Sequence, residues 1–140
     1  MALSDVFNDK RRDGVKHALS QAAVKIYRGS LVSINSSGYA VTGTSTASEK
    51  FAGVAYETVD NSAGSAGDTT IQVWRQGNFE FNYQGTAAQS DVGSMVWIVD
   101  DSTVATKTDA TVAVKVLVGV ITDYVSTSLV RVDINTNIIS

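Results

Sequence analysis

Side chains able to carry catalytic chemistry are few in this chain of 140 residues. His17 is the only histidine, and there is no cysteine. A nucleophilic serine needs a base within hydrogen-bond reach, and the residues after His17 offer neither His nor Cys for that role. A zinc ion would find only carboxylates there, and no glycine-rich phosphate loop with a lysine is present. The sequence therefore predicts that the protein is not an enzyme and binds no cofactor and no metal ion.

Two groups of carboxylates could suggest other chemistry. Asp100 and Asp101 are adjacent, but neighbouring residues of a strand point to opposite faces, and aspartate is common in turns. The segment 60–68 has an aspartate at each end, which suggests calcium, yet it lacks the alternating ligands of a calcium loop. We interpret it as a connector, rich in glycine and serine, between two strands.

Charge is unevenly distributed along the chain. Residues 1–28 contain six basic and three acidic residues (6 − 3 = +3), whereas residues 29–140 contain five basic and eleven acidic residues (5 − 11 = −6). The basic run 10–12 has no interleaved aromatic residues, and the acidic remainder would repel phosphate. The pattern favours docking on an acidic protein surface over direct binding of nucleic acid. A solvated tail on an ordinary acidic domain is the alternative.

Residues 1–22 differ from the rest of the chain and are interpreted as an N-terminal arm. The helical spacing of the apolar residues in 15–22 predicts at most a turn or two of helix. Such a segment can become ordered only against a partner. The candidate partner-contact residues of the arm are Leu3, Phe7, Arg11 and Arg12.

From residue 23 onward the chain alternates with a period of two and contains an internal repeat. The segment 29–32 (GSLV) recurs 64 positions later as 93–96 (GSMV), and 51–55 (FAGVA) recurs 66 positions later as 117–121 (LVGVI). The two copies cover approximately residues 29–76 and 93–134, with polar turns between short strands. The pattern predicts an all-β fold with a single domain over residues 23–140. We expect a small antiparallel β-barrel or β-tulip-like body built from two similar halves.

Two glycines lie inside predicted strands. Gly53 is at the middle of one strand, and Gly119 occupies the same position in the second copy of the repeat. Glycine inside a strand marks a bulge or the close approach of another backbone. We therefore expect such a feature at Gly53 and an interruption of the strand near Gly119.

Aromatic residues are the remaining candidates for binding. Trp74 shares a strand face with two glutamines, which leaves two interpretations open: burial in the protein's own core, or exposure as an interface anchor. Phe79, Phe81 and Tyr83 share one face of the next strand, which points either to the core or to a partner. Trp74 is added to the candidate partner-contact residues.

The segment 95–99 (MVWIV) is apolar on both faces. A strand of this kind is either central in its sheet or in contact with another subunit. If the protein is oligomeric, the candidate contact residues are Met95 and Trp97.

Six segments, taken in order, resemble one protein family. They are GSLVSINSSGYAV from residue 29, FAGVAYETVD from 51, IQVWRQGNFEF from 71, VGSMVWIVDDSTVAT from 92, VGVITDY from 118 and VRVDI from 130. Their order and spacing resemble the capsid cement, or head decoration, proteins of tailed bacteriophages over about residues 22–134. Ser94 stands where those chains more commonly have an acidic residue, and the arm lies outside the match.

The resemblance implies a structural protein of the virion. Such a protein is made in the host cytoplasm and binds the outer surface of the phage head. It would contact the major capsid protein, form a homotrimer on the capsid, and stabilise the shell by bridging capsid subunits. No apolar run approaches the roughly 18 residues of a membrane span, so we expect no membrane partner.

Two alternative functions stay open at this point. One is another virion structural β-domain, in the tail or baseplate. The other is a carbohydrate-binding module that uses Trp74 and the face of Phe79, Phe81 and Tyr83 as a stacking platform.

Overall fold

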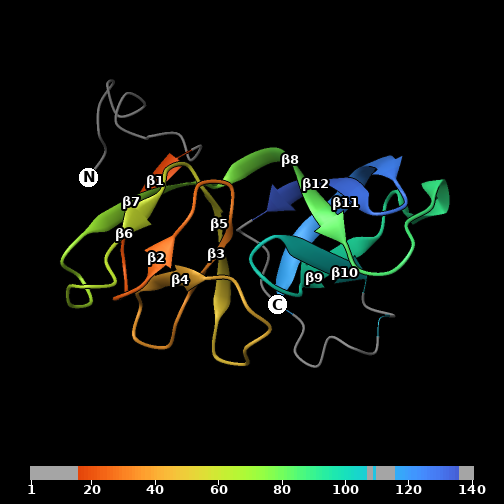
Figure 1. Ribbon diagram of the computed structural model, residues 1–140. Helices are drawn as coiled ribbons and strands as arrows, with labels where there is room; N and C mark the ends of the chain where they lie inside the picture. Colours follow the sequence, from red (N-terminus) through yellow and green to blue (C-terminus); the bar gives the residue numbers. More distant parts are fainter. Residues whose placement is uncertain (1–15, 107–108, 110–115, 136–140) are drawn as a thin grey trace, which may run out of the picture.

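The computed structural model describes residues 16–106, 109 and 116–135, and these residues form an all-β structure of two halves that lie side by side (Figure 1). The strands of the first half are β1 (Lys16–Ser20), β2 (Lys25–Ile26), β3 (Leu31–Ile34), β4 (Ala40–Thr42), β5 (Lys50–Ala55), β6 (Val59–Asp60) and β7 (Thr70–Trp74). The second half contains β8 (Gln76–Tyr83), the short 3₁₀ turn η1 (Gln89–Asp91), β9 (Met95–Ile98), β10 (Thr103–Thr106), β11 (Leu117–Ser126) and β12 (Leu129–Asn135).

The two halves have the same strand order. The first sheet runs β1-β7-β5-β3-β4, and the second runs β8-β12-β11-β9-β10. The second sheet closes into a barrel because β10 pairs in parallel with β8. In the first half, an isolated parallel bridge between Gln21 and Ala40 joins the chain after β1 to β4 in the same way. β2 and β6 form a separate two-stranded sheet. The prediction of an all-β, barrel-like body of two similar halves is confirmed.

Backbone hydrogen bonds recur at matching places and fix which positions are equivalent. Gly29 N donates to Ala55 O (2.9 Å), and Gly93 N donates to Ile121 O (2.8 Å). Two bonds made by the chain just after β1 likewise match two bonds made at the end of β8. The bonds are Gln21 N to Thr69 O (2.9 Å) and Ala22 N to Ala40 O (3.0 Å), matched by Tyr83 N to Ser128 O (2.8 Å) and Gln84 N to Val104 O (2.9 Å).

The equivalence extends to β1 and β8. β1 pairs antiparallel with β7, and β8 pairs antiparallel with β12, so Lys16 opposite Trp74 corresponds to Asn78 opposite Asp133. The arm predicted for residues 1–22 therefore differs from the structure in its last part, because residues 16–20 form a strand and not a helical turn. Sheet pairing overrides a weak helical spacing in so short a segment. Residues 1–15 lie outside the described part of the chain.

β8 also revises the place of the aromatic segment 74–83 in the repeat. The sequence placed the two copies at about residues 29–76 and 93–134, so most of this segment belonged to neither. In the structure, β8 opens the second half as β1 opens the first. Phe81 is buried, and Phe79 and Tyr83 pack against the same core. The face shared by these three aromatic residues therefore points inward.

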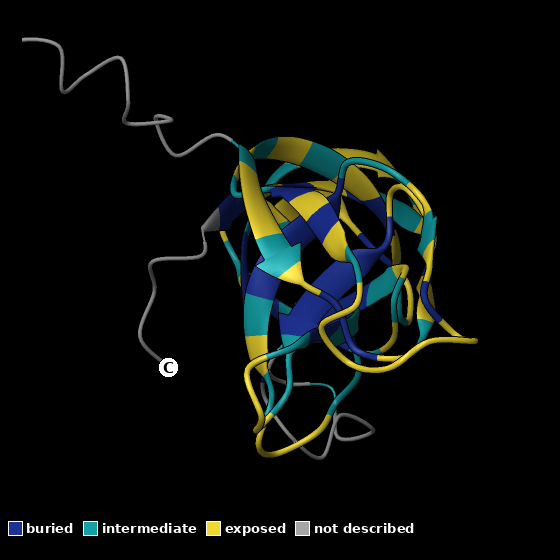
Figure 2. Ribbon diagram, turned by 90° about the vertical axis from the view of Figure 1, so that its left-hand side faces the viewer, coloured by how far each residue is buried: buried dark blue, intermediate teal, exposed yellow. Residues whose placement is uncertain are grey.

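Two hydrophobic cores fill the halves. The first contains side chains of the first half alone, among them Ile26, Val32, Ile71 and Val73. The second contains Phe81, Val96, Ile98, Val118 and their neighbours, together with Leu31 and Val54 from the first half. Figure 2 views the molecule from the side of the first half and shows buried segments enclosed by strands with half-buried and exposed residues. Because the second core includes residues of both halves, the halves stabilise each other.

The long loop after β6 is held by a buried amide. Asn61 is 4% exposed, and its Nδ2 donates to Ala22 O (3.1 Å), Ser65 O (2.9 Å) and, at longer range, Gln21 O (3.3 Å). These bonds tie the loop to the chain segment that follows β1. Asn61 thus anchors the segment 60–68 to the rest of the first half.

We expect Asn61→Ala to lower the free energy of unfolding by about 1–3 kcal/mol, because it leaves buried carbonyl groups with fewer donors. Urea denaturation followed by tryptophan fluorescence measures this change. Asn82→Ala, which removes an exposed amide, is the matched control and should stay within about 0.5 kcal/mol of the unsubstituted protein. Equal effects of the two substitutions would contradict the role assigned to Asn61.

Candidate interaction surfaces

Trp74 lies in a cluster of aromatic and cationic side chains on the first half. It is half-buried, and its ring meets that of Tyr56 edge to face, with centroids 5.1 Å apart and planes at 76°. Lys16 Nζ lies 4.2 Å from the Tyr56 ring centroid and 5.6 Å from that of Trp74. These distances are within range of cation–π attraction. We call Lys16, Tyr56 and Trp74 the aromatic cluster.

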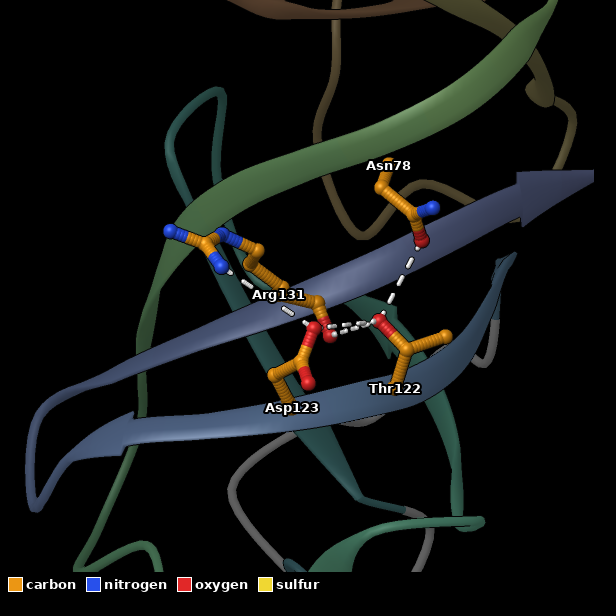
Figure 3. Close-up of polar contacts among 4 residues, drawn as sticks. All are labelled: Asn78, Thr122, Asp123 and Arg131. Atoms are coloured by element: carbon orange, nitrogen blue, oxygen red, sulfur yellow. Dashed lines mark hydrogen bonds and ion pairs between the residues drawn. The ribbon is translucent and has the colours of Figure 1, made fainter.

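The equivalent surface of the second half has different chemistry. Asn78, Thr122 and Asp133 occupy the positions of Lys16, Tyr56 and Trp74, as the matched strand pairs define them. Thr122 Oγ1 donates to Asn78 Oδ1 (3.2 Å), as Figure 3 shows. The fold is therefore compatible with small polar side chains at these positions, and the aromatic cluster is a property of the first half alone.

A weak ion pair completes that polar surface of the second half. Arg131 Nη1 lies 4.0 Å from Asp123 Oδ2, and both side chains are about half exposed (51% and 56%) (Figure 3). An ion pair so exposed contributes less than about 1 kcal/mol to stability. Nothing in this region offers an anchor comparable to a tryptophan.

The sequence left open whether Trp74 is buried or exposed, and the structure places it between the two. Part of the ring packs against the second core, and the rest stays accessible beside Tyr56. Lys16 and Tyr56 were not found by sequence reasoning, because only the pairing of β7 with β1 on one side and with β5 on the other brings them to Trp74. The other candidate partner-contact residues, Leu3, Phe7, Arg11 and Arg12, lie outside the described residues.

Met95 and Trp97 lie on the outward face of β9. Val96 and Ile98, which alternate with them, are fully buried in the second core. Met95 is 43% exposed, and Trp97 is half-buried, with its Nε1 enclosed and unpaired within the described part of the chain. β9 thus pairs with β10 on one side and with β11 on the other, and its outer face carries both candidate oligomer-contact residues.

A groove of about 200 Å³ opens at one end of the first half. It holds the only histidine of the chain, on β1, and an arginine from the connection between β7 and β8. The remaining walls are apolar: Leu19, Ile34 and Ala52 belong to the first core or pack at its edge, and Phe51 packs against the second core. The lining residues are His17, Leu19, Ile34, Phe51, Ala52 and Arg75.

Three of the four carboxylates considered in the sequence, those of Asp60, Asp68 and Asp100, are engaged in turns. Asp100 Oδ1 accepts a hydrogen bond from Ser102 N (2.9 Å), and Asp68 Oδ2 accepts one from Ser65 N (2.8 Å). Asp60 Oδ1 accepts bonds from the hydroxyl (2.5 Å) and amide (2.9 Å) of Ser62, which hold the pKa of that carboxyl below its ordinary value. Among the described residues, no three His, Asp or Glu side chains gather as they would around a metal ion.

No protein-family model matches the chain, and no curated protein matches it significantly. Within the described residues, no helix has the length and apolar character needed to cross a membrane.

Proposed function

We propose that this protein is a capsid cement protein, a structural component of the virion that binds the outer surface of a tailed-phage head. The observation that carries the proposal is the aromatic cluster. A partly exposed tryptophan, a tyrosine and a lysine gather on the first half, whereas the equivalent surface of the second half has none of them. Tryptophan, tyrosine and cationic side chains are common anchors of protein interfaces.

The proposed partner is the major capsid protein. Trp74 would insert as the anchor, and Lys16 would pair with an acidic group at the edge of the contact. The arm, with Leu3, Phe7, Arg11 and Arg12, would add a second contact from residues that directly precede Lys16. Two contacts on one small body allow it to bridge neighbouring capsid subunits, and repetition over the shell strengthens weak individual interfaces.

The proposed oligomer is a homotrimer seated on the capsid, with Met95 and Trp97 in its subunit contacts. The protein would be made in the host cytoplasm and added to the assembled head. The order and spacing of its segments, which resemble those of known cement proteins, support this assignment together with the acidic body and basic arm.

Binding to expanded heads that lack the protein tests the proposal, with co-sedimentation as the measurement. We expect Lys16→Glu and Trp74→Ala each to weaken binding at least about tenfold, since an interface anchor contributes about 2 kcal/mol or more. Asn78→Glu introduces the same acid at the equivalent position of the second half and is the matched control. Lys16→Glu leaves the core untouched, so its effect is separate from any loss of stability in Trp74→Ala.

The arm requires its own truncation. Removal of residues 1–15 keeps β1 intact, whereas removal through residue 21 would delete it. Weaker co-sedimentation of the truncated chain is expected, and undiminished binding would exclude the arm as a contact. Failure of the full chain to bind heads would overturn the proposed function. Localisation on tail or baseplate by cryo-microscopy, or binding on a glycan array, would then favour the corresponding alternative.

A further inference from the structure

The contact between the halves is made by one outer face of the first half. In Figure 1, β3 and β5 lie on the side of the first half that faces the second. Val32 and Ala55 point into the first core, while their neighbours Leu31 and Val54 point the other way, into the second core. Leu31 N also donates to Asp101 O in the turn between β9 and β10 (2.8 Å). We call Leu31, Ser33 and Val54 the internal donor face.

This face is well covered. Leu31 and Ser33 are 0% exposed, and Val54 is 2% exposed. Gly43 lies between Leu31 and Ile98: a Cβ added to this glycine would lie 3.2 Å from Leu31 Cβ and 3.3 Å from Ile98 Cδ1. Close packing of this kind is typical of a protein interior.

The region that receives the donor face in the second half is equivalent to the open groove of the first half. Each lining residue of that groove has a counterpart defined by the matched hydrogen bonds and registers. In the order His17, Leu19, Ile34, Phe51, Ala52 and Arg75, the counterparts are Phe79, Phe81, Ile98, Leu117, Val118 and Ile134. All are apolar, and all except the half-buried Phe79 are at most 9% exposed.

The first half therefore lacks the covering that the second half receives. Its groove, with Ile34 where the second half has Ile98, is an acceptor with nothing of the described chain inserted in it. No element of the described part of the chain packs on the donor face of the second half as the second half packs on that of the first. The repeat equivalents of Leu31, Ser33 and Val54 are Met95, Trp97 and Val120, and all three retain exposed surface.

We propose that the Met95–Trp97–Val120 face of one copy packs onto the groove of the first half of a second copy. Within one molecule, the donor face of the first half packs on the second half. The proposed contact uses the same packing between two molecules. It gives the proposed homotrimer its subunit contact and rests on that part of the proposed function. A contact between two different surfaces is heterologous, and it generates a closed ring when the rotation between copies permits closure.

Charge on the two surfaces supports the same arrangement. The groove contains His17 and Arg75 where the covered region of the second half has Phe79 and Ile134. Beside the donor faces, Trp74 of the first half is replaced by Asp133 in the second. Asp133 thus lies beside the donor face that would meet the groove with Arg75, whereas Trp74 lies beside the donor face that meets the apolar region.

Cysteine cross-linking tests the contact, because the natural chain has no cysteine. Inside the molecule, Leu31 packs near Ile98, so between molecules Met95 should lie near Ile34. We prepare the full chain as Met95→Cys and as Ile34→Cys, with different affinity tags, mix them, and oxidise gently. The expected product is a disulfide-linked pair with one copy of each variant. Tyr27→Cys, an exposed position of the first half outside the groove, replaces Ile34→Cys as the matched control.

The outcomes separate the proposal from its alternatives. Adding Asp133→Lys to the Met95→Cys chain should lower the yield of the mixed pair severalfold, and high salt should do the same. Pairs formed mainly by Met95→Cys with itself would overturn the inference in favour of a symmetric contact. A yield no higher than that of the Tyr27→Cys control would also overturn the inference. The groove would then be a contact for the chain's own arm or for the capsid. Capsids are absent from the experiment, so its failure is distinct from failure of head binding.

Discussion

Gly119→Ala is expected to lower the free energy of unfolding by more than about 3 kcal/mol, a large part of the total for a small domain. A Cβ on Gly119 would overlap the carbonyl oxygen of Asp133 on the paired strand β12 and would lie 3.0 Å from Ile134 Cα. The clashing atoms belong to the backbones of β11 and β12, which are paired by hydrogen bonds. The overlap can therefore be relieved only if these two strands move apart. Urea denaturation, followed by tryptophan fluorescence, measures the effect.

Gly53→Ala should have a similar effect for the same reason. Its Cβ would overlap the carbonyl oxygen of Trp74, and its φ of +146° also disfavours any L side chain. Gly38→Ala is the matched control. Its φ is +89°, but nothing lies within 4 Å of the added Cβ, so it should cost only the strain of about 1–2 kcal/mol. If Gly119→Ala were no more destabilising than Gly38→Ala, the close approach of the two strands would be contradicted.

These glycines are also the positions where the sequence predicted the structure most closely. A glycine in mid-strand indicated a bulge or close backbone approach at Gly53 and an interruption near Gly119. The structure has a close approach at both. β11 continues through Gly119 and is not interrupted there, but the register of its pairing with β9 shifts between Leu117 and Gly119. Such a prediction succeeds because the requirement is local: only glycine tolerates a backbone oxygen where Cβ would be.

The equivalence of β1 and β8 was beyond the reach of the sequence. His17 and Leu19 on β1 correspond to Phe79 and Phe81 on β8, and the two pairs share no residue type. What they share is a set of backbone hydrogen bonds, which any residue except proline can donate. The repeat could therefore be recognised only where glycines or similar apolar runs mark it, and the first strand of each half was missed.

The aromatic cluster was missed in part for a related reason. Lys16 and Tyr56 are 40 positions apart in sequence (56 − 16 = 40), and no periodicity connects them. They meet because β7 lies between β1 and β5 in the sheet. A tryptophan on a polar strand face could be flagged as a candidate, but its neighbours depend on strand order, which alternation alone does not specify.

Leu31→Ala is expected to destabilise the protein by about 2–5 kcal/mol, whereas Met95→Ala at the equivalent position should cost less than about 1 kcal/mol. Leu31 is 0% exposed within the second core, and Met95 is 43% exposed. The two positions are equivalent in the repeat, since Leu31 pairs with Val54 as Met95 pairs with Val120, so the pair compares a covered donor face with an uncovered one. Urea denaturation gives both values.

The same experiment tests whether the halves unfold together. Leu31 and Val54 belong to the first half by sequence and to the second core by packing, so loss of one core should expose the other. We expect one transition, with Trp74 fluorescence in Trp97→Phe and Trp97 fluorescence in Trp74→Phe changing at the same urea concentration within each variant. Two separate transitions, or equal costs for Leu31→Ala and Met95→Ala, would mean that the internal donor face contributes little. The proposed contact between two molecules is based on the packing of the internal donor face, so it would then lose its physical basis.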